Sequence, residues 1–361
     1  MIGLHTSGEY QIRLACAEDM PNIIELLPEL GGDSFSERFP GKSCTDLVRW
    51  KYFHNPDGDA AVGVALCGGR VVSIVAGIPQ LVRLGKNTVL AFRLGDFITT
   101  AEHRKRGLST ALVSLVCDVA RERGAAFVYV RPHEAIFRSL LSRLSFVEPE
   151  QIEPRRYVEL GPLVQRKVGL PASVVRGIGF DAIAKAMVLP KMSASVKVDA
   201  LDRFGKDVDE LWARTQDQYS FALVRTSHHL NWRYVDGPTP YRSWAAWRGS
   251  ELAGYLVAFR ARRQPVATIL DLFTHPKDEE AAATLLHVAL RDMLQRGSDV
   301  IYAWTLQHGA LSASYNLLRR TCRFVQKPLL HFAVRPLSEQ MQMQDVTGLR
   351  RQLGAGDFDS F

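Results

Sequence analysis

The sequence is poor in cysteine, and its cysteines follow no metal-binding pattern. Five occur among 361 residues. They form no Cys-x-x-Cys pair and no Cys/His spacing that would hold zinc. We therefore expect reduced, mostly buried thiols and no bound metal.

Long apolar runs are also missing. No run approaches the roughly 18 residues that a membrane span needs, and the first residues lack the basic start and apolar core of a secretory signal. The sequence thus predicts no membrane span and a cytoplasmic location.

The overall composition is typical of a soluble globular protein, with 47% hydrophobic and 23% charged residues. The length suggests two domains. A net charge of +7 favours anionic partners, which could be CoA, a nucleotide-linked sugar, nucleic acid or an anionic membrane surface. The alternative is a basic protein with scattered surface lysine and arginine.

A short basic turn at residues 104–110 is the most informative segment. It reads Arg-Lys-Arg-Gly-Leu-Ser-Thr and lies between a strand-like run, 88–99, and a helix-like run, 108–123. The first turn of a helix has backbone N–H groups without intrahelical partners and the positive end of the macrodipole, so it binds anions. Gly107 lets a bare backbone approach the anion, and the three basic residues suit a pyrophosphate better than a lone carboxylate.

The chain also repeats itself. A Trp-basic-Tyr motif at 50–52 returns at 232–234, and Gly-Asp-Phe-Ile-Thr at 95–99 is echoed by Leu-Asp-Leu-Phe-Thr at 270–274. In both halves a helix-like run ending in Arg-Gly, a strand and a Phe-Val pair follow in the same order. The shared order predicts two units of one fold.

Each unit is predicted to combine helices with a strand meander. In the first unit, turn signals separate strands at 61–66, 71–83 and 88–99. Apolar residues at i, i+3 and i+4 spacing predict one buried helix face from Leu108. The other predicted elements of this unit are a helix at 20–27, a strand at 126–130 and a helix at 135–144.

Four regions follow from this pattern. The predicted boundaries are 1–155 for the first domain, 156–195 for a connector of one or two helices, 196–335 for the second domain and 336–361 for a polar tail.

The basic turn and its surroundings resemble the GNAT acyl-CoA N-acyltransferases. Arg104-x-x-Gly107-x-Ser109 is similar to the R/Q-x-x-G-x-G/A pyrophosphate loop of that family. The lead-in Asp-Phe-Ile-Thr at 96–99 is similar to its Asp-Leu-Tyr-Val strand, and residues 141–147 are placed like its Tyr-x-x-x-Gly-Phe ending. The resemblance implies an α/β (α+β) fold: two tandem GNAT-like domains, each a mixed, mostly antiparallel twisted sheet flanked by helices.

The resemblance also implies a site for an acyl-CoA, such as acetyl-CoA, as co-substrate and with no metal. The backbone of Phe97, Ile98 and Thr99 would hydrogen-bond the pantetheine arm, and residues 128–131 would form the other wall of the cleft. The cofactor-binding loop would consist of Arg104, Lys105, Arg106, Gly107, Leu108, Ser109 and Thr110.

Three residues depart from the family pattern. Ser109 replaces the last Gly or Ala of the loop, and Glu134 replaces an Asn that commonly touches CoA. Leu141 stands where a Tyr often protonates the departing thiolate.

The corresponding loop of the second unit is acidic. It reads Pro-Lys-Asp-Glu-Glu at 276–280 and has no glycine. Charge repulsion would oppose a pyrophosphate there. We therefore expect a degenerate second domain that has lost CoA binding and supports or completes the acceptor site.

Acyl transfer to an amine needs a group that removes the amine proton and a proton for the departing thiolate. Asp96 is the leading catalytic candidate, because the family often has an acid there. The alternative is a structural role, since Asp271 repeats it in the second unit. His133 and Glu134 are further catalytic candidates, with a helix cap and dipole partner as the alternative.

The repeated aromatic residues have two interpretations. They could line an acceptor cleft, because aromatic faces bind sugars and cations, or they could pack in the core of each unit. The residues concerned are Trp50, Tyr52, His54, Trp232 and Tyr234.

Together these features favour an N-acyltransferase, most simply an N-acetyltransferase that uses acetyl-CoA and acts on a primary amine of a small molecule or sugar. We expect a monomer or homodimer that does not bind nucleic acid. One alternative is a non-catalytic CoA-binding or sensor protein. It is favoured by Leu141, which stands in place of the tyrosine that protonates the thiolate. The other is a tRNA-dependent aminoacyl transferase of the tandem type, which the net charge favours and the CoA loop opposes.

Overall fold

The fold is described from a computed structural model. It describes residues 5–7, 9–27, 43–158, 189–306, 312–338, 341, 351–352 and 355–357. Most of the predicted connector and most of the predicted tail therefore lie outside the described residues.

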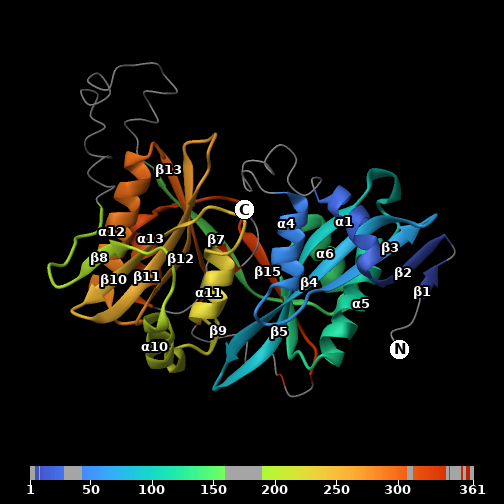
Figure 1. The fold of residues 1–361 in the computed structure, drawn as a ribbon, viewed down its shortest axis with the longest axis horizontal. Helices are drawn as coiled ribbons and strands as arrows, with labels where there is room; N and C mark the ends of the chain where they lie inside the picture. Colours follow the sequence, from blue (N-terminus) through green and yellow to red (C-terminus); the bar gives the residue numbers. More distant parts are fainter. Residues whose placement is uncertain are drawn as a thin grey trace.

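The first unit is a twisted, mostly antiparallel sheet between two helical layers (Figure 1). Its strands are β1 (His5–Ser7), β2 (Tyr10–Leu14), β3 (Ala61–Cys67), β4 (Arg70–Leu84), β5 (Asn87–Thr99), β6 (Phe127–Val130) and β7 (Val147–Val158). Its helices are α1 (Met20–Leu26), α4 (Cys44–Val48), α5 (Leu108–Glu122) and α6 (Glu134–Leu144), with short helical turns at Ala17–Asp19, Arg49–Phe53 and Ala101–His103. The predicted meander and the predicted helix from Leu108 are confirmed.

Helix α5 packs closely against β3 and β4. Its apolar face places Leu112, Val116 and Ala120 in the core, all fully buried. A Cβ at Gly77 in β4 would lie 2.5 Å from Val116 Cγ1, so glycine is what permits this approach. On the opposite face of the sheet, α1 and α4 cover a second core that includes Ile23.

The second unit repeats this arrangement. Its strands are β8 (Lys197–Ala200), β9 (Phe221–Leu223), β10 (Arg242–Arg248), β11 (Glu251–Arg260), β12 (Val266–Thr274), β13 (Val300–Leu306), β14 (Phe324–Val325), β15 (Leu330–Pro336) and β16 (Arg351–Gln352). Its helices are α10 (Lys206–Thr215), α11 (Ser227–Tyr234), α12 (Glu279–Gln295) and α13 (Ala313–Thr321), with turns at Gln216–Gln218 and Ala355–Asp357. Helices α12 and α13 border one core, and α10 and α11 border another.

The two units exchange strands and thereby form one continuous sheet. Strand β15, from the second half of the sequence, lies between β6 and β7 and is antiparallel to both. The carboxyl half of β7 pairs in turn with β13. Figure 1 shows β7 and β15 running through the middle of the molecule. The domain boundaries expected at 155 and 335 therefore fall within strands that serve both units, and they remain predictions.

The repeated Trp-basic-Tyr motifs meet where the units join. Trp50 and Trp232 stack with ring centroids 5.2 Å apart and an interplanar angle of 23°. Each indole N–H donates to the backbone carbonyl of the other tryptophan, at 2.7 and 3.0 Å. Both rings are buried, as are Tyr52 and Tyr234, so packing is their role in this structure, whereas His54 is exposed.

Candidate functional site

The basic turn leads from β5 into α5 through two residues with left-handed backbone. Lys105 has a φ of 62° and Gly107 a φ of 78°. Gly107 is the residue that precedes α5, and no side chain caps the helix there. The N–H groups of the first helical turn are therefore available to an external anion.

A pocket of about 540 Å³ opens at this helix start. Every residue predicted to bind the cofactor lines it except Ile98, whose side chain is buried on the other face of the sheet. The lining residues are Phe97, Thr99, His103, Arg104, Lys105, Arg106, Gly107, Leu108, Ser109, Thr110, Val113, Ile136, Arg138, Ser139, Leu140, Ser142 and Arg143.

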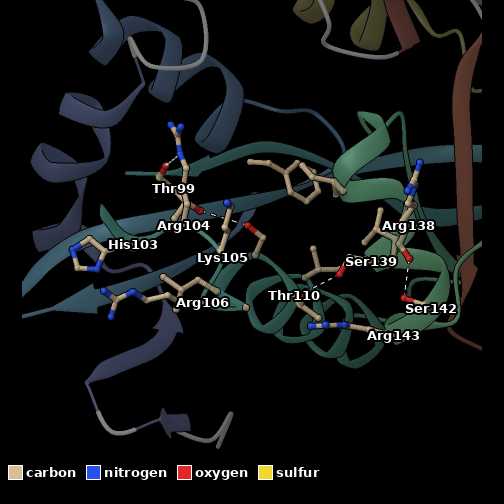
Figure 2. A pocket seen from close by; sticks show the side chains of 17 residues that line it. Thr99, His103, Arg104, Lys105, Arg106, Thr110, Arg138, Ser139, Ser142 and Arg143 are labelled. Atoms are coloured by element: carbon tan, nitrogen blue, oxygen red, sulfur yellow. Dashed lines mark hydrogen bonds between the residues drawn. The ribbon is translucent and has the colours of Figure 1, made fainter. Parts of the chain in front are cut away.

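Helix α6 supplies a wall that the sequence reasoning missed. Figure 2 shows Arg138, Ser139, Ser142 and Arg143 across the pocket from the basic turn. Ser139 Oγ lies 3.2 Å from the hydroxyl oxygen of Thr110, which ties α6 to α5. The signal was present in the sequence as polar residues three to five positions apart on one helix face.

The three basic side chains of the turn differ in their partners. The guanidinium of Arg104 donates to the Thr99 carbonyl at 3.0 Å, and Arg106 pairs with Glu9 at 2.9 Å. Lys105 is exposed. With Arg138 and Arg143 opposite, the pocket concentrates positive charge around the helix start, which suits a ligand with more than one phosphate.

Strands β5 and β6 part as they approach the turn. Their parallel pairing covers Ala91, Phe92 and Arg93 and is not continued toward Thr99. On the far side of β5, Ile98 and Thr99 pair with Ile74 and Ser73 of β4. Among the described strands, none covers the edge of β5 that faces β6 here, so that edge can pair with an extended ligand, as the resemblance implied.

Asp96 lies at an irregular point of β5. The register with β4 shifts between Ile74 and Ala76, and Asp96 has a φ of 52°, which is uncommon for a residue other than glycine. Its carboxylate accepts hydrogen bonds from Lys51 Nζ at 2.8 Å and from the Tyr52 hydroxyl at 2.7 Å. Both carboxylate oxygens therefore have partners, which favours an orienting role over that of a base.

His133 and Glu134 lie at the start of α6. The imidazole of His133 is exposed and does not cap the helix. Glu134 pairs with Arg138 at 2.9 Å and with His331 Nε2 at 2.7 Å. None of the three predicted catalytic residues lines the pocket.

His331 belongs to the exchanged strand β15 and joins it to the first unit. Its Nδ1 lies 2.8 Å from Glu148, and its ring stacks on Phe137 at 3.8 Å. Burial lowers the pKa of His331, but hydrogen bonds and charge from Glu148 and Glu134 outweigh it, so the pKa lies above its ordinary value. A histidine from the second half of the sequence thus holds the start of α6.

The helix start of the second unit is closed by the chain itself. Asp278 precedes α12, and its carboxylate accepts from the N–H of Ala281 at 3.0 Å. Arg248 pairs with Asp278 and Glu280, and Arg320 pairs with Glu279. The acidic residues of this loop therefore cap and surround the helix start instead of leaving it to a ligand.

Among the described residues of the second unit, the space beside the strands that correspond to β5 and β6 is small. A cavity of only about 10 Å³ lies beside β12 and β13, and Ala355 of the chain's last described turn lines it. Asp357 of the same turn pairs with the buried Arg225 at 3.4 Å. Ala355 and Asp357 therefore pack against the sheet of the second unit.

Comparison with known proteins identifies the first unit. Residues 11–140 match the family model described as an acetyltransferase (GNAT) domain. Residues 11–140 of this chain form a GNAT domain. No curated protein matches the sequence.

Solved structures share the whole fold at low sequence identity. A GCN5-related N-acetyltransferase from Anabaena variabilis superimposes with a TM-score of 0.63 and 12% identity, over 91% of this chain and 73% of that one. Saccharomyces cerevisiae N-myristoyltransferase with bound myristoyl-CoA gives 0.60 and 12%, over 92% and 80%. A tandem GNAT protein from the clavulanic acid biosynthesis pathway gives 0.57 and 14%, over 92% and 100%.

At these identities the likeness shows the fold. The chain therefore has the tandem architecture that the repeat predicted, and it shares its fold with the N-acetyltransferase, the N-myristoyltransferase and the tandem GNAT protein named above. Within the described segments, no helix is both long and apolar enough to cross a membrane.

Proposed function

We propose that this protein transfers an acyl group, most simply acetyl, from acyl-CoA to a primary amine of a small molecule or sugar. The observation that carries the proposal is the pocket at the start of α5, where an uncapped helix end and five Arg and Lys side chains converge. A nucleotide with a pyrophosphate matches that combination. The match of residues 11–140 to the GNAT family supports it.

Each part of the pocket has a proposed role. The N–H groups after Gly107 and the side chains of Lys105 and Arg106 bind the pyrophosphate. The free edge of β5 at residues 97–99 pairs with the pantetheine arm. Helix α6 closes the other side through Arg138 and Arg143.

We propose His133 as the first residue to test for removal of the amine proton. Asp96 and Glu134 are engaged with cationic partners, whereas the His133 imidazole is exposed at the end of the splayed strands. An imidazole exchanges protons near neutral pH, as acyl transfer to an amine requires. We expect His133→Gln to slow turnover by about 100-fold or more without weakening CoA binding.

The cofactor assignment is tested by calorimetric titration of the full chain with CoA. Lys105→Glu should weaken binding about 10-fold to 100-fold, because it replaces a charge-assisted contact with repulsion. Lys277→Glu, at an exposed lysine in the corresponding loop of the second unit, is the control and should leave the affinity unchanged. Equal affinities for both variants and the wild type would contradict the assignment.

Acyl transfer is tested by release of free CoA thiol from acetyl-CoA and from longer acyl-CoAs in the presence of a panel of primary amines. Amine-dependent thiol release would establish the reaction and its acyl preference. Tight CoA binding with no release on any amine would instead indicate a sensor.

A further inference from the structure

Three side chains outside the proposed transfer chemistry converge beside the basic turn. They are Glu9, Cys67 and His103, and one ligand atom of each lies within 4.8 Å of the other two. Glu9 precedes β2, Cys67 ends β3 and His103 lies in the turn after β5. Because the positions are 58 and 36 residues apart, no sequence motif reveals the cluster and only the fold assembles it.

One nitrogen of the His103 imidazole contacts a neighbouring side chain. The Tyr10 hydroxyl lies 2.8 Å from its Nδ1. If that nitrogen is the N–H donor, Nε2 carries the free lone pair. A second contact that fixes the tautomer in this way is typical of metal-binding histidines.

A cavity gives access to the cluster. It has a volume of about 290 Å³, and Cys67 and His103 are among the residues that line it. The cavity is large enough to admit a hydrated ion and to leave room for a water ligand. Glu9 is exposed, whereas Cys67 and His103 are half-buried.

The chemistry of the three ligands selects the ion. A thiolate, an imidazole and a carboxylate form a ligand set that Zn²⁺ accepts and that Mg²⁺ and Ca²⁺ do not prefer.

We propose that Glu9, Cys67 and His103 form a Zn²⁺ site with an open fourth position at the rim of the pocket. Binding replaces the S–H bond of Cys67 with a Zn–S bond and releases the proton to solvent.

The site is coupled to the basic turn through Arg106. The guanidinium of Arg106 now pairs with Glu9 at 2.9 Å and lies over the Tyr10 ring. A metal ion that takes the Glu9 carboxylate releases Arg106 toward the pocket, where its charge is available to a phosphate. Metal and CoA then strengthen each other's binding, and this part of the inference rests on the proposed function.

The site is tested on the full chain without CoA by titration with Co²⁺, which reports thiolate ligation through a charge-transfer absorption band. We expect the band in the wild type, with one equivalent of Co²⁺ bound and displaced by Zn²⁺. Cys67→Ser should abolish the band, and Tyr10→Phe should lower the affinity about 10-fold to 100-fold. Cys44→Ser removes another half-buried cysteine and should keep the band.

No band in the wild type, or the same band in Cys67→Ser, would overturn the site. Thermal unfolding without metal shows whether Cys67→Ser is folded, and His103→Gln gives an independent variant that should lose at least about 10-fold in Co²⁺ affinity. The coupling is tested separately: Zn²⁺ should tighten CoA binding in the wild type but not in Arg106→Gln. Equal tightening in both would overturn the coupling and leave the metal site supported by its absorption band.

Discussion

Two helix starts in this chain have the same place in the fold and opposite chemistry. Helix α5 follows Gly107 and three basic residues and has no side-chain cap. Helix α12 follows Asp278, whose own carboxylate accepts from the N–H of Ala281 and pairs with Arg248. The fold supplies the same N–H groups and dipole in both units, and the residue at the cap decides whether an external anion can use them.

The comparison extends to the strand before each helix. Asp96 in β5 and Asp271 in β12 occupy equivalent places in the repeat, and both bind a cation and a tyrosine. Asp96 does so with Lys51 and Tyr52, which belong to the Trp-basic-Tyr motif. Asp271 instead uses Arg225 and Tyr255. The acid is present both in the unit whose helix start is uncapped and in the unit whose helix start is capped. Its presence in both indicates that its main role is to orient the strand.

The largest expected effect comes from removing this acid in the first unit. Asp96→Asn takes a carboxylate away from the buried Lys51 ammonium, so we expect it to lower the free energy of unfolding by about 3–5 kcal/mol. Asp271→Asn should cost less, because Asp357 stays beside Arg225. Denaturant unfolding measures both.

The Asp96→Asn variant also distinguishes a structural role of Asp96 from a catalytic one. If Asp96 orients the strand, turnover per folded molecule should survive in Asp96→Asn under conditions where it is folded. If turnover instead falls by about 100-fold or more while stability stays normal, which is the scale of a missing general base, Asp96 is the base.

The next largest effect is expected on CoA affinity. The substitution introduces at α5 the acidic cap that the second unit has at α12. Gly107→Asp places a carboxylate at the start of α5, and we expect CoA affinity to fall at least about 100-fold because two charge-assisted contacts are opposed. Gly107→Asn is the neutral control for shape and should lose far less. Gly124→Asp, at the other end of α5 with a φ of 79°, controls for left-handed strain.

Calorimetric titration with CoA distinguishes these variants. A loss of affinity as large in Gly107→Asn or Gly124→Asp as in Gly107→Asp would show that strain, rather than charge, decides binding.

The sequence predicted the strands and the helix around this candidate site because their signals are local. The turns that separate β3, β4 and β5 and the glycine before α5 each depend on neighbouring residues. The exchange of β7 and β15 could not be predicted, since a strand's sequence specifies its buried face and not which partner lies beside it. The same holds for the stacking of Trp50 on Trp232, which joins positions 182 residues apart.

The parts of the site that were missed depend on distant contacts. Arg138 and Arg143 enter the pocket because α6 packs beside α5. In the second unit, Ala355 reaches the small cavity beside β12 and β13 from a distant part of the sequence. A prediction of which side chains share a pocket requires the arrangement of the elements, which the repeat supplied only in outline.

A smaller effect is expected from His331, the imidazole that the second half contributes to the first unit. Its pKa is raised in the folded protein, so its pairing contributes stability that is fully present below pH about 6.5 and is lost as pH rises through the raised value. We expect His331→Gln to cost about 1 kcal/mol at pH 6 and clearly less at pH 9.

Thermal unfolding of wild type and variant at both pH values measures this difference. His287→Gln is the control variant. It removes an imidazole of the second unit that contacts the Pro190 carbonyl instead of a carboxylate pair such as that of His331. A cost for His331→Gln that is the same at pH 6 and pH 9 would contradict the charged pairing with Glu134 and Glu148.

The smallest effect tests whether the cap alone separates the two units. Asp278→Gly, Glu279→Arg and Glu280→Ser together give α12 a basic, uncapped start like that of α5. We expect no second CoA site, because the cavity beside β12 and β13, where the rest of the cofactor would have to lie, is about 10 Å³, scarcely room for one water molecule. The variant should lose about 1 kcal/mol of stability with its cap, and calorimetry should still count one CoA per chain. A count of two would show that the carboxylates, and not the packing of Ala355 against β12 and β13, keep the second unit from binding the cofactor.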